Sequence, residues 1–132
     1  MYNLYLDDFR SPIDSFYYLG NPIYNILDWK IVRNYNEFVK MIQENGIPET
    51  ISFDNDLADI HYENQSNINY DDCIEKTGYH CAKWLIDYCL DNKSMIPKTI
   101  TILVHSMNPV GSKNIKSLFI SYNKHIDFIF MF

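Results

Sequence analysis

The chain has 132 residues and carries 11 Lys or Arg against 17 Asp or Glu, which gives a formal net charge of −6. This length fits one domain over residues 1–132 with a core of its own. A hydrophobic fraction of 47%, with 11 Tyr and 8 Phe, excludes a disordered chain. The acidic balance argues against a clamp on duplex DNA or RNA, because such proteins need a basic surface. It does not exclude a small phosphorylated ligand, since a bound cation inverts the local charge.

The sequence shows no pattern of export or membrane insertion. Its cysteines, Cys73, Cys81 and Cys89, are spaced by eight residues without a CxxC pair, so they indicate neither a zinc knuckle nor a disulfide framework. The N-terminus lacks the basic and apolar regions of a signal peptide, and no run approaches 18 apolar residues. We therefore expect a cytoplasmic protein with reduced thiols and no membrane partner.

The first third of the chain alternates between strand and helix patterns. A strand is predicted over residues 2–6 and a second over 30–33, and the stretch 11–28 between them predicts an irregular connection or one short helix. Asn34 is a plausible N-cap with Glu37 three residues on, which is a capping-box pattern. The apolar face of this helix follows the spacing i, i+3, i+4, i+7: Tyr35, Phe38, Val39 and Ile42.

The rest of the chain continues this alternation. It predicts a strand over 50–53, a long polar loop over 57–76, a helix from 77 to about 93, a strand over 99–104, a helix that begins at 108, and a last strand over 126–132. Short, continuous apolar strands that alternate with helices predict a parallel sheet covered on both faces.

Acidic residues follow two of these strands, Asp7 and Asp8 after the first and Asp54 and Asp56 after the third. Ligands of open α/β sheets bind beyond the carboxyl ends of the strands. If the two strands are parallel neighbours, four carboxylates converge, which is unfavourable unless a proton or a cation lies between them. Carboxylates without nearby His or Cys suit Mg²⁺, Mn²⁺ or Ca²⁺. The alternative is that these residues are helix caps and solvated loop acids.

A polar segment also follows the strand over 99–104. His105 could act as a general acid or base on a phosphate ester, or it could be a structural residue. Ser106, Asn108 and the free N–H groups of the following helix could form an anion site, with Gly111 allowing close approach of the backbone to a ligand. The alternative is that Ser106 and Asn108 only cap that helix.

Two further residues could contact a phosphate. Arg10 could reach one in the same cleft, or pair with a neighbouring acidic residue at the surface. Thr77 opens a helix directly after the long loop, where it could face a phosphate or simply act as the cap. The motifs GxGxxG, GxxxxGK[ST], HExxH and GxSxG are absent from the sequence, which removes the common dinucleotide, P-loop, zinc-protease and α/β-hydrolase interpretations.

Four segments carry a resemblance to a known family. Residues 6–12 have the form LDDxRxP, residues 51–57 resemble ISFDHDLG, residues 77–85 resemble TGxxCAxWL, and residues 104–111 with Asn114 resemble VHSxNPxGxxN. All four occur in this order in the cyclic-phosphate processing receiver domain family, which the chain resembles over nearly its whole length.

The resemblance implies a receiver-like, flavodoxin-like three-layer α/β/α sandwich with a five-stranded, mainly parallel sheet in the order 2-1-3-4-5. It also implies a divalent metal, Mg²⁺ or Mn²⁺, at the acidic motif positions Asp7, Asp8, Asp54 and Asp56. His105 and Ser106 match the signature after the fourth strand. The implied activity is the processing of cyclic phosphates, including the 2′,3′-cyclic ends of RNA.

Two features depart from the family pattern or from ordinary receivers. Asn55 replaces the middle histidine of FDHD, and Ala58 replaces the following glycine. If that histidine is catalytic, the protein binds its ligand without turnover. The ordinary phospho-receiver also needs a lysine after its fifth strand, and none follows here, which argues against phosphorylation of Asp54.

The leading hypothesis is a metal-dependent phosphoesterase acting on a small phosphorylated ligand or an RNA end. Its catalytic residues would be His105, Asp54 and Asp8, and its substrate-binding residues Arg10, Ser106, Asn108, Gly111, Asn114 and Thr77. The alternatives are a module that sequesters a cyclic nucleotide, a degenerate response regulator, and an adaptor that presents Tyr17, Tyr18, Tyr24 and Trp29. An exposed last strand would favour a dimer.

Overall fold

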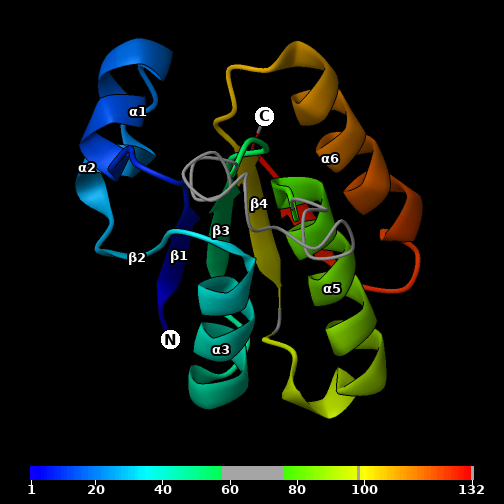
Figure 1. Cartoon of the computed structure of the whole chain (residues 1–132). Helices are drawn as coiled ribbons and strands as arrows, with labels where there is room; N and C mark the ends of the chain where they lie inside the picture. The colour runs from blue at the N-terminus through cyan, green and yellow to red at the C-terminus, as the bar shows by residue number, and fades with distance from the viewer. Residues whose placement is uncertain (58–75, 98, 132) are drawn as a thin grey trace, which may run out of the picture.

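A computed structural model describes residues 1–57, 76–97 and 99–131, and contains a five-stranded sheet in the order β2-β1-β3-β4-β5 (Figure 1). Each neighbouring pair of strands is parallel. The strands are β1 (Asn3–Leu6), β2 (Trp29–Val32), β3 (Thr50–Phe53), β4 (Ile100–Val104) and β5 (Phe128–Phe130). The expected fold class and strand order are therefore confirmed. Most of the long loop predicted over 57–76, with Ala58 and Cys73, lies outside the described residues.

The helices are α1 (Pro12–Leu19), α2 (Ile23–Ile26), α3 (Tyr35–Asn45), α5 (Gly78–Asp91) and α6 (Pro109–Tyr122), with a 3₁₀ turn η2 (Lys93–Met95) after α5. Crossovers between parallel strands are right-handed. The connection from β1 to β2 runs toward one edge of the sheet, and the later crossovers run toward the other edge. This reversal places α1 and α2 on one face and α3, α5 and α6 on the other, which makes three layers (Figure 1). No helix in the described ranges is long and apolar enough to cross a bilayer.

The connection over 11–28 differs from the prediction of one short helix or none, because it contains two. Ser11 begins α1, where its backbone N–H donates to the side chain of Asp14 at 2.9 Å. Gly20 ends α1 in the left-handed conformation with φ 71°, and its N–H donates to the carbonyl of Phe16. Pro22 then starts α2. The proline and glycine that obscured a periodic pattern are therefore the boundaries of two separate helices.

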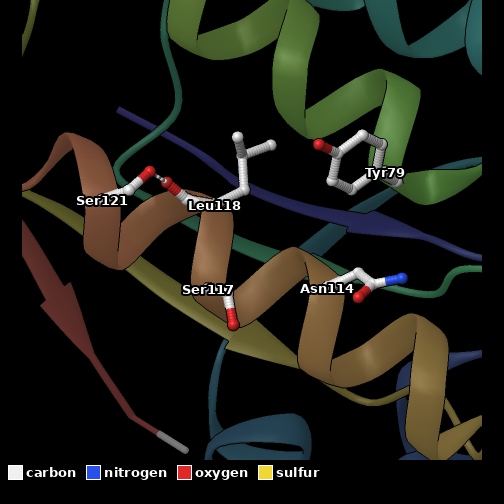
Figure 2. A pocket seen from close by; sticks show the side chains of 5 residues that line it. All are labelled: Tyr79, Asn114, Ser117, Leu118 and Ser121. Carbon is white, nitrogen blue, oxygen red and sulfur yellow. Dashed lines mark hydrogen bonds between the residues drawn. The ribbon is translucent and has the colours of Figure 1, made fainter.

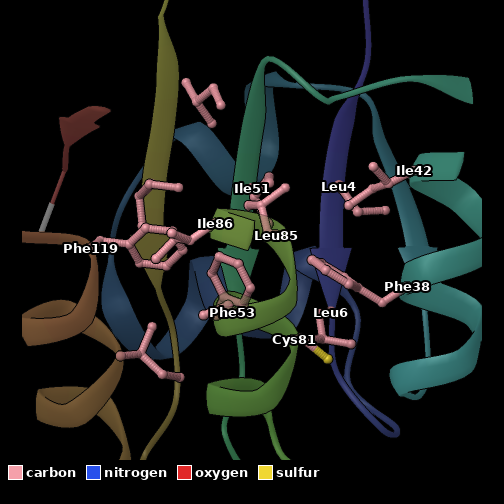
Figure 3. Close-up of a cluster of buried hydrophobic side chains, with 14 of the residues drawn as sticks. Leu4, Leu6, Phe38, Ile42, Ile51, Phe53, Cys81, Leu85, Ile86 and Phe119 are labelled. Atoms are coloured by element: carbon pink, nitrogen blue, oxygen red, sulfur yellow. The ribbon is translucent and has the colours of Figure 1, made fainter. Parts of the chain in front are cut away.

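The larger core lies between the sheet and the three helices α3, α5 and α6 (Figure 3). Asn34 caps α3 by accepting the backbone N–H of Glu37 at 2.9 Å, which aims the apolar face of α3 at the sheet. The buried residues of this core include Leu4, Leu6, Phe38, Ile42, Ile51, Phe53, Cys81, Leu85, Ile86 and Phe119. Their removal from water is the main force that holds these helices on the sheet.

Cys81 and Cys89 face this core and are buried. Burial raises the pKa of the Cys89 thiol to about 12 and that of Cys81 further, so neither is a thiolate at neutral pH.

The second core is smaller, and it is aromatic. Tyr5 of β1, Tyr24 of α2 and Leu103 of β4 are buried together on the opposite face of the sheet. Phe16, Ile23 and Trp29 pack against them. Side chains alternate between the two faces of a strand. Leu4 and Leu6 of β1 face the larger core, so Tyr5 between them faces this side, and Ser52 is its register partner on β3. This small core lies beneath the carboxyl ends of the strands that carry the predicted site.

Candidate functional site

Three carboxylates converge at the carboxyl edge of the sheet. Leu6 and Phe53 are register partners at the ends of β1 and β3, so the residues that follow them are brought side by side. Asp7, Asp8 and Asp54 each place one oxygen within 4.8 Å of the others. Asp7 and Asp54 are buried, and Asp8 is partly buried. Asp8, Arg10, Asp54 and Asp56, together with Phe9 and Met107, line a cleft of about 240 Å³.

The carboxylate of Asp7 is held from three directions. Its Oδ1 accepts the backbone N–H groups of Phe9 and Arg10 at 3.0 and 2.8 Å, and its Oδ2 lies 3.0 Å from Nε2 of His105. Burial by itself would raise the pKa of Asp7, but these hydrogen bonds outweigh it and lower the pKa to about 2. Asp7 is therefore an ionised, oriented carboxylate at neutral pH.

Asp54 has the opposite electrostatic situation. Burial, followed by the negative charge of Asp7, raises its pKa to about 6, although the N–H of Asn55 donates to Oδ1 at 2.8 Å. Negative charge at this edge of the sheet is therefore not fully compensated by the protein itself. Three carboxylates at such separations provide the hard oxygen ligands that Mg²⁺ or Mn²⁺ prefers, and the donor set fits such an ion.

Asp56 was expected as a fourth metal ligand, but it lies outside this group of three. Its side chain is exposed at the cleft, and Oδ1 accepts the amide groups of Asn55 and Asn108 at 3.4 Å each. Its negative charge still contributes to the raised pKa of Asp54. The structure thus assigns Asp56 to the rim of the cleft.

His105 is placed behind the carboxylates and is 0% exposed. Its Nε2 lies against Asp7, and its Nδ1 lies 2.7 Å from Oγ of Ser52, so both ring nitrogens have partners. Burial lowers the pKa of His105, and Asp7 opposes that effect. This position is inconsistent with the expected general acid or base, because a substrate in the cleft cannot contact a buried ring whose two nitrogens are occupied.

The expected anion site at the start of α6 is occupied by the protein itself. Oδ1 of Asn108 accepts the N–H groups of Val110 and Gly111, both at 3.1 Å. Oγ of Ser106 accepts the N–H of Asn108 at 3.2 Å. These bonds satisfy the helix donors that a phosphate would have used. The capping interpretation of Ser106 and Asn108 is therefore the one that the structure supports.

The two glycines of the motifs are explained by packing. A Cβ at Gly111 would overlap the side chain of Asn55, and a Cβ at Gly78 would overlap the carbonyl oxygen of Asp54. The N–H of Gly78 also donates to the carbonyl of Asn55 at 2.8 Å. Both helices therefore approach the loop after β3 at contact distance. Gly111 makes room for Asn55, and not for a ligand as was expected.

Thr77 and Asn114 also lie away from the carboxylates. The N–H and the hydroxyl of Thr77 both contact Nδ1 of His80, at 2.9 and 3.0 Å, so Thr77 belongs to the cap of α5. Figure 2 shows Asn114 on α6 facing Tyr79 on α5, in a separate pocket between these helices. Neither residue lines the acidic cleft, so their expected contact with the same substrate is not supported.

Arg10 lines the cleft, as the sequence predicted. Its guanidinium lies 5.4 Å from the ring centres of both Phe9 and Tyr18. Nη1 of Arg33 donates to the carbonyls of Asp7 and Arg10, at 3.2 and 2.5 Å, and thereby holds the loop between them. Cation–π contacts restrict the guanidinium at the cleft.

Several functional residues were missed by sequence reasoning. Phe9 and Met107 line the cleft although they read as loop residues, and Ser52 reads as an ordinary strand residue. Tyr24, expected on an exposed adaptor surface, is 3% exposed, while Tyr17 is 78% exposed. A signal for Ser52 was available, since a serine between apolar neighbours in a buried strand requires a hydrogen-bond partner.

The model of the cyclic-phosphate processing receiver domain matches residues 2–121 of the chain. The chain belongs to this family. The match runs from just before β1 into the last turn of α6, and includes all of the residues that form the acidic cleft. Neither the curated proteins nor the solved structures include one that matches the chain. Membership of the cyclic-phosphate processing receiver domain family thus agrees with the resemblance carried by the four motifs, and with the receiver-like strand order.

Proposed function

We propose that the protein is a metal-dependent phosphoesterase that opens a cyclic phosphate on a nucleotide or at the 2′,3′-cyclic end of an RNA. The observation that carries this proposal is the convergence of Asp7, Asp8 and Asp54 at the cleft that Asp8, Asp54 and Arg10 line. The family description supports the class of substrate, since it names the processing of cyclic phosphates.

Asp7, Asp8 and Asp54 are the residues that would hold the ion, because they supply carboxylate oxygens within 4.8 Å of one another. A bound divalent cation would polarise the phosphoryl group and activate water for attack. Asp7 enters this centre already ionised, and Asp54 loses its proton more readily when positive charge replaces the repulsion from Asp7. A bound cation would therefore stabilise the ionised forms of the carboxylates that hold it.

Arg10 is the phosphate-binding residue that the cleft supplies. Its guanidinium presents a rigid set of N–H donors that match two phosphate oxygens. Contact with the rings of Phe9 and Tyr18 reduces the freedom that binding would otherwise remove. In the net reaction the oxygen of one water joins phosphorus, one P–O bond of the ring breaks, and the leaving oxygen takes a proton from solvent in the open cleft. The product is a phosphomonoester.

The rim of the cleft favours a substrate with a planar ring. Phe9 and Met107 line the cleft beside the carboxylates, and they are 67% and 60% exposed. An exposed aromatic ring next to a phosphate site offers a surface on which a nucleobase stacks. A cyclic phosphate of a simple polyol has no such group, so we infer that nucleotides or RNA ends are preferred.

A second candidate function is a module that binds the cyclic phosphate without hydrolysing it. Asn55 stands where the family motif has histidine, and its side chain packs against Gly111. His105 is buried behind Asp7. The described lining of the cleft therefore contains no histidine that could protonate a leaving group, which favours binding over turnover.

The test is ³¹P NMR of the full chain with a panel of phosphates, first with Mg²⁺ or Mn²⁺ and then with EDTA. The panel contains 2′,3′-cyclic nucleotides, 3′,5′-cyclic nucleotides, a cyclic dinucleotide, a base-free polyol cyclic phosphate and acetyl phosphate. We expect a monoester resonance that grows with time, requires metal, and appears first with the 2′,3′-cyclic nucleotides.

The other outcomes discriminate between the hypotheses. A shifted or broadened substrate resonance without product would favour the binding module. Consumption of acetyl phosphate with modification of the protein would favour a degenerate response regulator phosphorylated on Asp54. A panel without any change, with metal present, would contradict the proposed activity on these phosphates.

A further inference from the structure

A chain of buried hydrogen bonds connects the acidic centre to α2. Oδ2 of Asp7 lies 3.0 Å from Nε2 of His105, Nδ1 of His105 lies 2.7 Å from Oγ of Ser52, and Oγ of Ser52 lies 2.7 Å from the hydroxyl of Tyr24. None of the four side chains is more than 3% exposed. The chain thus passes from the end of β1 through the end of β4 and the middle of β3 to α2.

The chemistry of these groups fixes which atom carries each proton. A carboxylate can only accept, so Nε2 of His105 donates to Asp7. In the neutral ring Nδ1 is then the acceptor, and Ser52 donates its hydroxyl proton to it. Oγ of Ser52 is left to accept from the hydroxyl of Tyr24. The Asp7 carboxylate therefore sets the tautomer of His105, and Ser52 and Tyr24 complete the chain of donors and acceptors that matches it.

Aromatic packing prevents the imidazole of His105 from turning. The ring of Tyr5 stacks on it with centres 4.3 Å apart and planes 6° apart. The ring of Tyr24 meets it edge-on, with centres 6.1 Å apart. The hydroxyl of Tyr18 donates to the backbone carbonyl of His105. The ring is therefore fixed in position as well as in tautomer.

The polar chain contrasts with the packing on the other face of the sheet. The opposite face of β1 and β3 is covered by a core made of apolar side chains such as Leu6 and Phe53. Buried polar groups cost free energy unless every partner is in place. Here every buried side-chain nitrogen or oxygen among the described residues has a hydrogen-bond partner. A complete polar network under an acidic cleft is what the orientation of one of its ligands would require.

We propose that Tyr24, Ser52 and His105 are positioning residues that fix the carboxylate of Asp7 for the metal centre. The proposal rests on the proposed function, because it takes Asp7 as part of that centre. Three of the roughly four acceptor positions of the carboxylate are used by Phe9, Arg10 and His105. The remaining acceptor position of the Asp7 carboxylate, which a metal ion could use, is therefore held in a fixed direction. Loss of the Ser52 hydroxyl leaves Nδ1 of the buried ring without its partner, so the ring is held less firmly in the orientation from which Nε2 donates to Oδ2.

The test measures the dissociation constant of Mn²⁺ for the full chain by electron paramagnetic resonance, together with unfolding in urea. Ser52→Ala is expected to weaken Mn²⁺ binding about 10-fold, the lower end of the effect of removing a residue that orients a metal ligand. Tyr24→Phe removes one hydroxyl and is expected to weaken binding in the same direction by less. These variants avoid His105, whose removal opens the core and threatens folding.

Tyr5→Phe is the matched control. Tyr5 is buried in the same aromatic core and stacks on His105. Its hydroxyl, however, contacts Ser15 at 2.7 Å and the carbonyl of Ser11 at 3.1 Å, and takes no part in the chain of hydrogen bonds from Asp7 to Tyr24. The variant keeps the stacked ring and loses a buried hydrogen bond, as Tyr24→Phe does. It is expected to lower stability by a similar amount and to leave Mn²⁺ affinity unchanged.

Nitrogen NMR of the His105 ring supplies a readout that does not depend on metal. We expect Nε2 to carry the proton in the wild type, and the Nδ1 resonance to move in Ser52→Ala. A protonated Nδ1 that donates to Ser52 from a neutral ring would overturn the proposal.

The metal results separate two failures. If Ser52→Ala and Tyr24→Phe bind Mn²⁺ as tightly as the wild type does, the chain of hydrogen bonds is only structural and the positioning role is wrong. The metal centre would still stand in that case. If the wild type does not bind Mn²⁺, the metal centre of the proposed function fails, and the positioning role fails with it.

Discussion

Nε2 of His105 lies 3.0 Å from Oδ2 of Asp7, and neither side chain is exposed to solvent. The histidine therefore lies on the protein side of the carboxylate, while Asp8 and Asp54 lie on the side of the cleft. An imidazole that contacts a carboxylate from behind orients it and lowers its pKa. In the proposed function, contact with the substrate therefore falls to Arg10 and to the carboxylates that line the cleft.

Asp54→Asn is expected to abolish cyclic-phosphate hydrolysis while the fold is kept. The substitution removes one of the three converging carboxylates and keeps a side chain of nearly the same shape. The loss should exceed 100-fold in kcat/KM, measured by ³¹P NMR or by a coupled phosphatase assay. Asp87→Asn is the matched control, because Asp87 is exposed on α5 and does not line the cleft. Full activity in Asp54→Asn would contradict the proposed role of the acidic centre.

Asp54 is expected to favour folding of the metal-free protein as the pH falls from about 6 to 4, against the opposite effect of His105 and His80, whose pKa values are lowered by burial. The pKa of Asp54 is about 6 in the folded protein against an ordinary value of 3.8, so the folded state binds more protons within this window. The effect amounts to about 2–3 kcal/mol at most, which follows from about 1.4 kcal/mol per pKa unit. The pKa of Asp7 is about 2, so its contribution is present above pH 3.8 and is lost as the pH falls toward 2.

Urea unfolding in EDTA at a series of pH values measures this dependence. The free energy of unfolding of the wild type should rise relative to that of Asp54→Asn as the pH falls from 6 to 4, and both proteins should lose the contribution of Asp7 at lower pH. A wild-type curve that matches that of Asp54→Asn throughout this window would show that Asp54 has an ordinary pKa. Addition of Mg²⁺ should stabilise the wild type more at pH 7 than at pH 4, because protons and the cation compete for the same carboxylates.

Gly78→Ala is expected to lower both the stability and the affinity for metal. Its Cβ would overlap the carbonyl oxygen of Asp54, so the start of α5 and the loop after β3 must separate. Overpacking of this kind costs about 1–3 kcal/mol, and the displaced backbone carries Asp54 of the proposed metal centre. Gly20→Ala is a control for substitution of a glycine, since nothing lies within 4 Å of its added Cβ and only its positive φ is strained.

The two glycine variants are compared by urea unfolding and by titration with Mn²⁺. Both should lose stability, and only Gly78→Ala should bind Mn²⁺ more weakly. Equal Mn²⁺ affinity in the two variants would show that the contact between α5 and Asp54 is not needed for the metal centre.

Phe9→Ala is expected to raise KM for 2′,3′-cyclic nucleotides about 10-fold, because stacking of one base on an aromatic ring is worth about 1–3 kcal/mol. Hydrolysis of a base-free cyclic phosphate should change much less. Tyr17→Ala removes another exposed aromatic side chain on nearby α1 and is the control, since Tyr17 does not line the cleft. An equal loss on substrates with and without a base would contradict stacking at Phe9 and indicate an effect through Arg10.

Local sequence determined the order of strands and helices. Asn34 and Asn108 mark helix starts that the structure confirms, and the apolar runs before Asp7 and Asp54 are parallel neighbours in the sheet. Capping and periodicity act over a few residues, so they can be read from the chain directly. The connection over 11–28 was harder, because Gly20 and Pro22 divide it into helices too short to show a period.

The acidic centre was also predictable, since neighbouring parallel strands of equal register must bring the residues after them together. What only the tertiary structure decided is the direction of each polar side chain at that edge. His105 turns inward because Ser52 and Tyr24 offer partners on the face of the sheet covered by α2. Asp56 and Asn108 turn to each other at the rim. Such directions depend on contacts between segments far apart in the chain, and hydrogen bonds in a buried site are satisfied only by the groups that folding places within reach.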